Sequence, residues 1–290
     1  MALRKIVGGR PAVPSDTTLA FAFDSSYLAP FGAMIRSMVR LETLLDCPVA
    51  IYSDDARVFN HPLVKLIADE RRLLDGDLLA TLQRAARDTV RRPERATWNR
   101  GTFLKWAVFE PQPTRQLLFL DVDMLCRAPL EPLIAEAPDA AFVSAPQVQT
   151  ILFEDETGGT RPPADVAARL QRLLDGDLWG PHAHRVNSGV MLVRAPLLRT
   201  EFRDALLAFA FRGGLQFNEQ THMSAYFGAH PGLLHMVGIK YNFQANYLRH
   251  VAEDRRQSLV SQAAILHFAG KSKPWKVAAP EPHHLEWFRA

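Results

Sequence analysis

The sequence has little cysteine and no long apolar run. Its 290 residues include two cysteines, Cys47 and Cys126, and neither belongs to a Cys-x-x-Cys pair. Two cysteines cannot build a disulfide framework, and without such a pair there is no sign of a zinc or redox motif. No segment reaches the roughly 20 apolar residues of a membrane-spanning helix, and the first residues lack the apolar core of a signal peptide. We therefore expect a cytoplasmic protein without a transmembrane segment.

The sequence also lacks a strong excess of charge of either sign. It has 34 basic and 31 acidic residues, a formal net charge of +3, and this balance is too even to argue for a nucleic-acid partner. Arginines gather locally between Arg84 and Arg100. Such a run is most often a solvated face, and the alternative is contact with an anionic acceptor or, peripherally, with the inner face of a membrane.

Short apolar segments alternate with helical patterns along the chain, and 48% of the residues are hydrophobic. This alternation predicts an α/β sheet flanked by helices. The predicted strands cover residues 18–23, 48–54, 115–121, 140–144, 186–195 and 263–269. The predicted helices cover residues 30–45, 78–90, 103–109, 164–174 and 196–211, and a further helix is expected to begin near Asn218.

Two aspartates directly follow the apolar run LLFL. Asp121 comes at the end of this run, and Asp123 follows two residues later. Ligands of open α/β sheets bind at strand ends, and two carboxylates at this spacing can share a hard divalent ion that bridges phosphate oxygens. Aspartates also cap helices and stabilise turns, so this motif alone leaves a structural role open.

A second motif, HFAGKSKPW, covers residues 267–275. His267 ends an apolar segment and can supply a nitrogen ligand to a metal. Gly270 allows backbone amides to approach a phosphate closely, and Lys273 brings a positive charge to it. The same residues also fit a core histidine followed by a solvated basic turn.

Together, these two motifs resemble those of the family 8 glycosyltransferases, the retaining group that includes glycogenin and bacterial lipooligosaccharide galactosyltransferases. Three weaker motifs occur in the matching order: AFDSSY at residues 22–27, VNSGVMLV at 186–193 and FNEQT at 217–221. The resemblance implies a GT-A fold, an α/β domain with a mixed, mostly parallel central sheet. It implies a single domain over residues 1–290, in which residues 1–123 form a nucleotide-binding half. Residues 124–290 form the acceptor and sugar half, with a metal and phosphate motif at 265–276.

The resemblance also implies roles for particular residues. Asp121, Asp123 and His267 would hold Mn²⁺ or Mg²⁺, and Tyr27 would stack on the base of the donor. The donor site would consist of Ala22, Phe23, Asp24, Tyr27, Lys105, Asp121, Val122, Asp123, Asn187, Ser188, Gly270 and Lys273. Gln220 would lie near the anomeric carbon, beside Glu219, which stands where the family commonly has Asp.

The implied reaction is transfer of a hexose, galactose or glucose, from a UDP-sugar to a carbohydrate or glycolipid acceptor such as a bacterial surface glycan or lipooligosaccharide. An amide is a weak nucleophile, so Gln220 favours front-face attack with retention. A covalent intermediate on Glu219 is the alternative.

Two other functions remain open from the sequence. One is a sugar nucleotidyltransferase, although such an enzyme usually begins with a Gly-rich basic signature, and GGR at Gly8 is a poor match to it. The other is a nucleotide-sugar-binding protein without turnover. The set of Asp, His, Lys and Gln residues argues against this second function.

Overall fold

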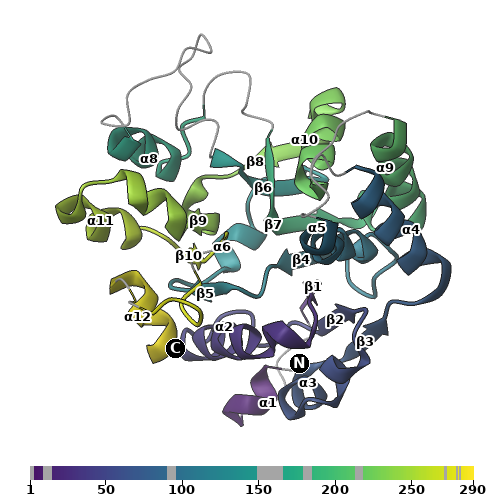
Figure 1. Ribbon diagram of the computed structural model, residues 1–290, viewed down its shortest axis with the longest axis horizontal. Coiled ribbons are helices and arrows are strands. Elements are labelled where there is room, and N and C mark those ends of the chain that lie inside the picture. Colours follow the sequence, from purple (N-terminus) through teal and green to yellow (C-terminus); the bar gives the residue numbers. More distant parts are fainter. Residues whose placement is uncertain are drawn as a thin grey trace.

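The computed structural model describes residues 3–8, 15–89, 96–148, 166–178, 185–212, 218–270, 273–278, 280 and 282–290. Within this part of the chain, strands form one sheet of seven and one sheet of three (Figure 1). The segment 146–163, whose glycine and proline residues predict a loop, lies outside the described residues from position 149 onward.

The large sheet has the strand order β3-β2-β1-β4-β7-β6-β8. Its strands are β1 (Thr17–Ala22), β2 (Val49–Ser53), β3 (Glu70–Leu73), β4 (Gln116–Leu120), β6 (Phe142–Pro146), β7 (Val186–Arg194) and β8 (Leu234–Met236). All pair in parallel except β7, which runs antiparallel to both β4 and β6. The expected α/β architecture with a mixed, mostly parallel central sheet is confirmed.

The helices lie on both sides of this sheet (Figure 1). The α-helices are α1 (Arg4–Val7), α2 (Leu28–Arg40), α3 (Pro62–Ile67), α4 (Gly76–Asp88), α5 (Ala96–Phe103), α6 (Glu131–Ile134), α8 (Val166–Leu174), α9 (Thr200–Arg212), α10 (Glu219–Ala229), α11 (Glu253–Val260) and α12 (Pro282–Arg289). The 3-10 helices are η1 (Ser25–Tyr27), η2 (Ala56–Asn60), η4 (Leu104–Val108), η6 (Ala195–Leu197), η7 (Pro231–Leu233), η8 (Ile239–Asn242) and η9 (Ala245–His250). Among the described residues, none of these helices is both long enough and apolar enough to cross a membrane.

Side chains of the large sheet alternate between its two faces, as the pleat of a strand requires. On β1, Leu19 and Phe21 join the core that α2 covers, whereas Ala20 joins the core beneath α4, α9 and α10. On β4, Leu118 and Phe119 divide in the same way. Both faces are therefore buried, which explains why these strands read as continuous apolar runs in the sequence.

The small sheet positions His267, one of the three predicted metal ligands. Its strands are β5 (Met124–Cys126), β9 (Phe243–Gln244) and β10 (Ile265–His267), in the order β5-β10-β9. β5 runs antiparallel to β10, with Met124 opposite His267. The small sheet has a separate hydrophobic core, which includes residues of α8 and α11. The pairing brings His267 beside the residues that follow β4.

The predicted elements agree with the structure except at some ends. The helix predicted over 30–45 ends at Arg40, because Glu42 and Leu44 adopt positive φ angles of 51° and 54° that no right-handed helix accommodates. The helix predicted over 103–109 is the 3-10 helix η4. The last predicted strand is shorter, Ile265–His267. The boundary after Asp123 stays a prediction.

Phe227 links the helix that carries two predicted catalytic residues to the large sheet. Its side chain is fully buried, and its ring stacks on Phe142 of β6 with centroids 4.4 Å apart. The substitution Phe227→Ala would leave a cavity that the surrounding side chains can fill only partly. It is therefore expected to lower the free energy of unfolding by about 3–5 kcal/mol, measured by urea denaturation. Phe288, 57% exposed, is the control, and an equal loss in Phe288→Ala would contradict this explanation.

Candidate functional site

Asp121 and Asp123 lie where the large sheet passes into the small one. β4 ends at Leu120, and the Asp121 N–H donates to the carbonyl of Gly189 on β7 at 2.8 Å. Asp123 precedes β5, and its carbonyl accepts from the Phe268 N–H at 2.9 Å. The backbone of each aspartate is therefore fixed by a different neighbouring strand end.

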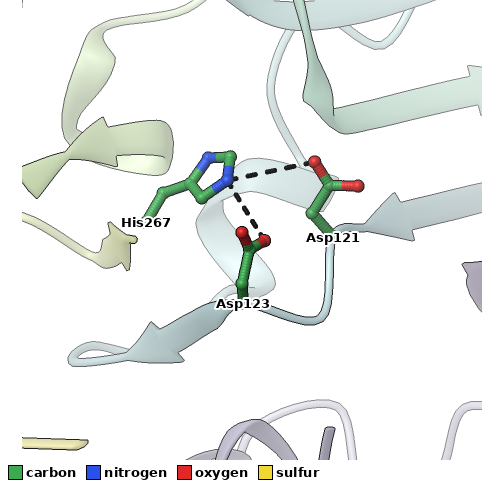
Figure 2. Close-up of side chains that lie close together, drawn as sticks. All are labelled: Asp121, Asp123 and His267. Carbon is green, nitrogen blue, oxygen red and sulfur yellow. Dashed lines mark ion pairs between the residues drawn. The ribbon is translucent and has the colours of Figure 1, made fainter. Parts of the chain in front are cut away.

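His267 completes a cluster of three residues (Figure 2). Its Nε2 lies 3.2 Å from Asp123 Oδ1 and 3.9 Å from Asp121 Oδ2. One ligand atom of each residue lies within 4.8 Å of the others. Two ligands at right angles on an ion, each about 2.1 Å from it, are about 3.0 Å apart, so these separations fit a divalent cation.

Asn242 of η8 orients the ring of His267, and sequence reasoning missed this residue. Its Oδ1 lies 2.7 Å from His267 Nδ1. An amide oxygen only accepts, so Nδ1 of His267 carries a proton, and Nε2 is the ring nitrogen that would ligate an ion. This arrangement is the one that a metal-ligating histidine needs.

Two buried lysines neutralise the two aspartates. Lys105 Nζ donates to Asp121 Oδ2 at 2.9 Å, and Lys273 Nζ contacts Asp123 Oδ2 and donates to the Phe268 carbonyl. Each lysine is only 7% exposed. The predicted metal ligands and the two lysines therefore come together in one network of charges, in which Asp121 is the partly exposed member.

The two aspartates differ in their electrostatic surroundings. Burial raises the pKa of Asp121, although Lys105 opposes the shift. Burial also opposes ionisation of Asp123, but His267 and Lys273 outweigh it, so the pKa of Asp123 is well below its usual range. Asp123 is thus the carboxylate that its neighbours hold more firmly in the ionised form.

The Lys105 ammonium also connects Asp121 to the start of α10. Ser188 Oγ donates to Glu219 Oε1 at 2.6 Å, and Lys105 Nζ lies 3.3 Å from Ser188 Oγ and 3.5 Å from Glu219 Oε1. All three side chains are buried. The Ser188 hydroxyl hydrogen is therefore used within the protein.

Two buried polar atoms, one on β7 and one on α10, have no protein partner. Within the described part of the chain, neither Asn187 Nδ2 nor Glu219 Oε2 makes a hydrogen bond. An unsatisfied buried polar group costs about 1–3 kcal/mol. One free donor and one free acceptor on facing elements, β7 and α10, are suited to a hydroxyl-bearing ligand. Gln220 follows Glu219 in the first turn of α10 and is partly exposed.

The predicted base-binding residues lie at the end of β1. Asp24 caps η1 by accepting from the Ser26 N–H at 2.8 Å. The Tyr27 ring packs edge-on against Trp275, with centroids 6.4 Å apart. Burial, followed by the charges of Asp123 and Asp121, raises the pKa of Tyr27 to about 12. Tyr27 therefore lies in contact with the turn that follows β10 and within the electrostatic influence of both aspartates.

The four other residues predicted for the donor site differ in how far they are buried. Phe23 stacks on Phe31 and is buried, and Val122 is buried in the same core, so a donor could reach them only through their backbone. Ala22 ends β1 and is partly exposed. Gly270 has a φ of +83°, a conformation that glycine adopts readily.

Gly189, noted above only as part of the motif VNSGVMLV, is also a site residue. A Cβ at this position would lie 2.9 Å from His267 Cε1, 3.0 Å from Met124 Cε and 3.1 Å from Asp121 Oδ2. Real Cβ atoms do not approach other atoms this closely, so β7 can pass behind the cluster only with glycine here.

Gly189→Ala is therefore expected to displace Asp121 and His267 and to weaken Mn²⁺ binding, measured by calorimetric titration. Gly101→Ala is the control, because nothing lies within 4 Å of a Cβ there. Equal Mn²⁺ affinity in the two folded variants would show that the close approach of β7 is unimportant.

His222 is a buried histidine that sequence reasoning also missed. It lies on α10 near Phe103 and Trp106, with ring centroids 6.1 and 6.4 Å away. In the part of the structure that is described, neither ring nitrogen has a hydrogen-bond partner. Burial lowers the pKa of His222 to about 4, although the charge of Glu219 opposes the shift. The ring is therefore neutral in the folded protein at pH 7.

This pKa predicts a loss of stability in acid. Unfolded histidine titrates near 6.5, so between about pH 6.5 and pH 4 the unfolded state binds a proton that the folded state does not. The free energy of unfolding should fall over this range by up to ~3 kcal/mol on account of His222. Urea denaturation of wild type and His222→Leu measures this difference, and identical pH dependence would refute it.

Comparison with known proteins agrees with this geometry. The family model described as glycosyl transferase family 8 matches residues 18–279. A search of curated protein sequences found no match. Among solved structures, the apo-form glycosyltransferase GlyE of Streptococcus pneumoniae TIGR4 is 16% identical with a TM-score of 0.62; the match covers 96% of this chain but 60% of that one. The galactosyltransferase LgtC, in complex with donor and acceptor sugar analogues, is 17% identical with a TM-score of 0.55.

The LgtC match covers 94% of both chains. At these identities, the structural likenesses establish the fold alone, the GT-A fold of glycosyltransferases. The family model, by contrast, spans nearly the whole described site, from β1 to the turn after β10. The chain belongs to glycosyltransferase family 8.

Proposed function

We propose that the protein transfers a hexose, galactose or glucose, from a UDP-sugar to a carbohydrate or glycolipid acceptor with retention at the anomeric carbon, and that it requires Mn²⁺ or Mg²⁺. The observation that supports this most directly is the meeting of Asp121, Asp123 and His267 at the ends of strands from two sheets. The name of LgtC, a galactosyltransferase, supports galactose as one candidate sugar.

The diphosphate of the donor is the group that this site is suited to stabilise. Negative charge grows on the diphosphate as the bond to the sugar breaks, and an ion on Asp121, Asp123 and His267 supplies positive charge to it. Lys273 and Lys105 place two ammonium groups beside the same position. Fixed charges in a site without bulk water need no reorganisation during the reaction, which is why they accelerate it.

The two ends of the donor have separate partners in this proposal. Tyr27 stacks on the uracil, and Asp24 accepts a hydrogen bond from the base. The unpaired Asn187 Nδ2 and Glu219 Oε2 bind hydroxyl groups of the sugar. Because a hydrogen-bonding site rejects ligands that leave its buried groups unpaired, these atoms favour a hydroxylated ring at this position.

Gln220 fits the catalytic position better than Glu219 does. One oxygen of Glu219 accepts from Ser188 and lies 3.5 Å from the Lys105 ammonium, so the charge of this carboxylate is already engaged within the protein. A nucleophile must reach the anomeric carbon, whereas Glu219 is held within the network of Lys105. Gln220 is partly exposed beside it. This contrast supports front-face attack, in which the acceptor hydroxyl arrives on the side from which UDP departs.

In the described part of the basic stretch between Arg84 and Arg100, two arginines have partners within the protein. The Arg84 guanidinium lies over the ring of Phe211, 4.6 Å from its centroid, and Arg100 pairs with Asp54 at 2.6 Å. Positions 90–95 lie outside the described residues. A bacterial surface glycan or lipooligosaccharide as acceptor, peripheral contact with the inner face of a membrane and a cytoplasmic location stay predictions.

A thermal-shift panel of nucleotide sugars tests this function. A ligand that binds only the folded protein raises its melting temperature, so a UDP-hexose should do so with Mn²⁺ and much less without it. Asp123→Asn is expected to lose the Mn²⁺-dependent rise in melting temperature. Its rate of sugar transfer should fall by about 10²- to 10³-fold or more, while circular dichroism shows an intact fold. Near-normal transfer by folded Asp123→Asn would refute the metal assignment.

A further inference from the structure

The two carboxylate oxygens of Asp123 face different partners. Oδ1 lies 3.2 Å from His267 Nε2, on the side of the three-residue cluster. Oδ2 contacts the Lys273 ammonium, which also donates to the Phe268 carbonyl at 2.7 Å. Lys273 is thus packed directly against a residue that the proposed ion needs as a ligand.

The charges of the site change sign when an ion enters alone. Three carboxylates (Asp121, Asp123 and Glu219) and two ammonium groups (Lys105 and Lys273), when all are ionised, carry a net charge of −1 between them. A divalent ion changes this net charge to +1 in a buried site, where an uncompensated charge is costly. A diphosphate supplies the missing negative charge.

The two lysines are not held equally. Lys105 retains Ser188 and Glu219 as partners whatever happens at Asp121. Lys273 has Asp123 and one backbone carbonyl. Lys273 comes three residues after Gly270 in the chain and has a flexible side chain. Its ammonium lies 5.8 Å from the ring centroid of Trp275. Trp275 contacts Tyr27, the proposed base-stacking residue, so Lys273 lies on the side where the donor is expected.

We propose that Lys273 couples ion binding to nucleotide binding. Without nucleotide, its ammonium holds Asp123 and repels a divalent cation. When a nucleoside diphosphate binds, Lys273 moves from Asp123 Oδ2 to a phosphate oxygen, and Asp123 becomes fully available to the ion. The ion and the nucleotide then bind as a pair, each weakly without the other. This inference rests on the proposed function, because it assigns the ion and the diphosphate to this site.

Titration of Mn²⁺, followed by the EPR signal of the free ion, tests the coupling without any assay of turnover. Lys273→Met should bind Mn²⁺ alone at least about fivefold more tightly than wild type, because the competing ammonium is gone. The gain in Mn²⁺ affinity on adding UDP should be smaller in the variant than in wild type. Reciprocity requires the same decrease in the effect of Mn²⁺ on UDP affinity.

Lys276→Met is the matched control, because Lys276 is exposed in the same turn and should leave Mn²⁺ affinity unchanged. If folded Lys273→Met binds Mn²⁺ alone as wild type does, or more weakly, the inference is overturned. In that case the proposed function still stands, provided that wild type binds Mn²⁺ in the presence of UDP. Wild type that binds no Mn²⁺ with or without UDP would overturn the proposed function as well.

Removing Lys273 leaves Asp123 without its buried cation, so the variant is expected to melt at a lower temperature than wild type; recovery of its melting temperature by Mn²⁺ would support the inference. A crystal structure of wild type with Mn²⁺ and UDP gives a readout that needs no variant. Lys273 Nζ is expected on a phosphate oxygen and out of contact with Asp123. An ammonium still bound to Asp123, with ion and UDP both present, would overturn the coupling.

Discussion

The antiparallel pairing of β5 with β10 is the constraint on which the candidate site depends. β5 begins one residue after Asp123, and its first residue, Met124, lies opposite His267. This register places an imidazole from the end of the chain beside two carboxylates that lie almost 150 residues earlier. The large sheet contributes the other half of the geometry, because the backbone of Asp121 is bonded to Gly189 on β7. The cluster therefore exists only where the two sheets meet.

Burial makes the charges around this cluster interdependent. Each aspartate has a lysine partner, and Lys105 extends the network to Glu219. Since an unpaired charge in such surroundings is expensive, no member can leave or enter without a compensating change elsewhere. The proposed cation and diphosphate carry opposite charges, so under this proposal the site binds them together more readily than separately.

The start of α10 shows how one side chain can decide the role of its neighbour. Ser188 and Lys105 occupy one oxygen of Glu219 and keep the carboxylate within the protein, whereas Gln220 is partly exposed. A carboxylate next to an amide would suggest a nucleophile from its chemistry alone. Its hydrogen bonds point instead to a group that orients Lys105 and offers its second oxygen to a ligand.

The sequence by itself determined five strands of the large sheet, β1, β2, β4, β6 and β7, and the aspartates that follow β4, because hydrophobic periodicity and a motif at a strand end are local properties. The two edge strands, β3 and β8, were not predicted. The sequence motifs also indicated His267 as a partner of these aspartates. Only the tertiary structure decided that Asn242 orients His267, that Ser188 bonds to Glu219, and that no side chain larger than hydrogen fits at Gly189. These facts depend on contacts between segments that are distant in the chain, and no local pattern records which atoms such segments bring together.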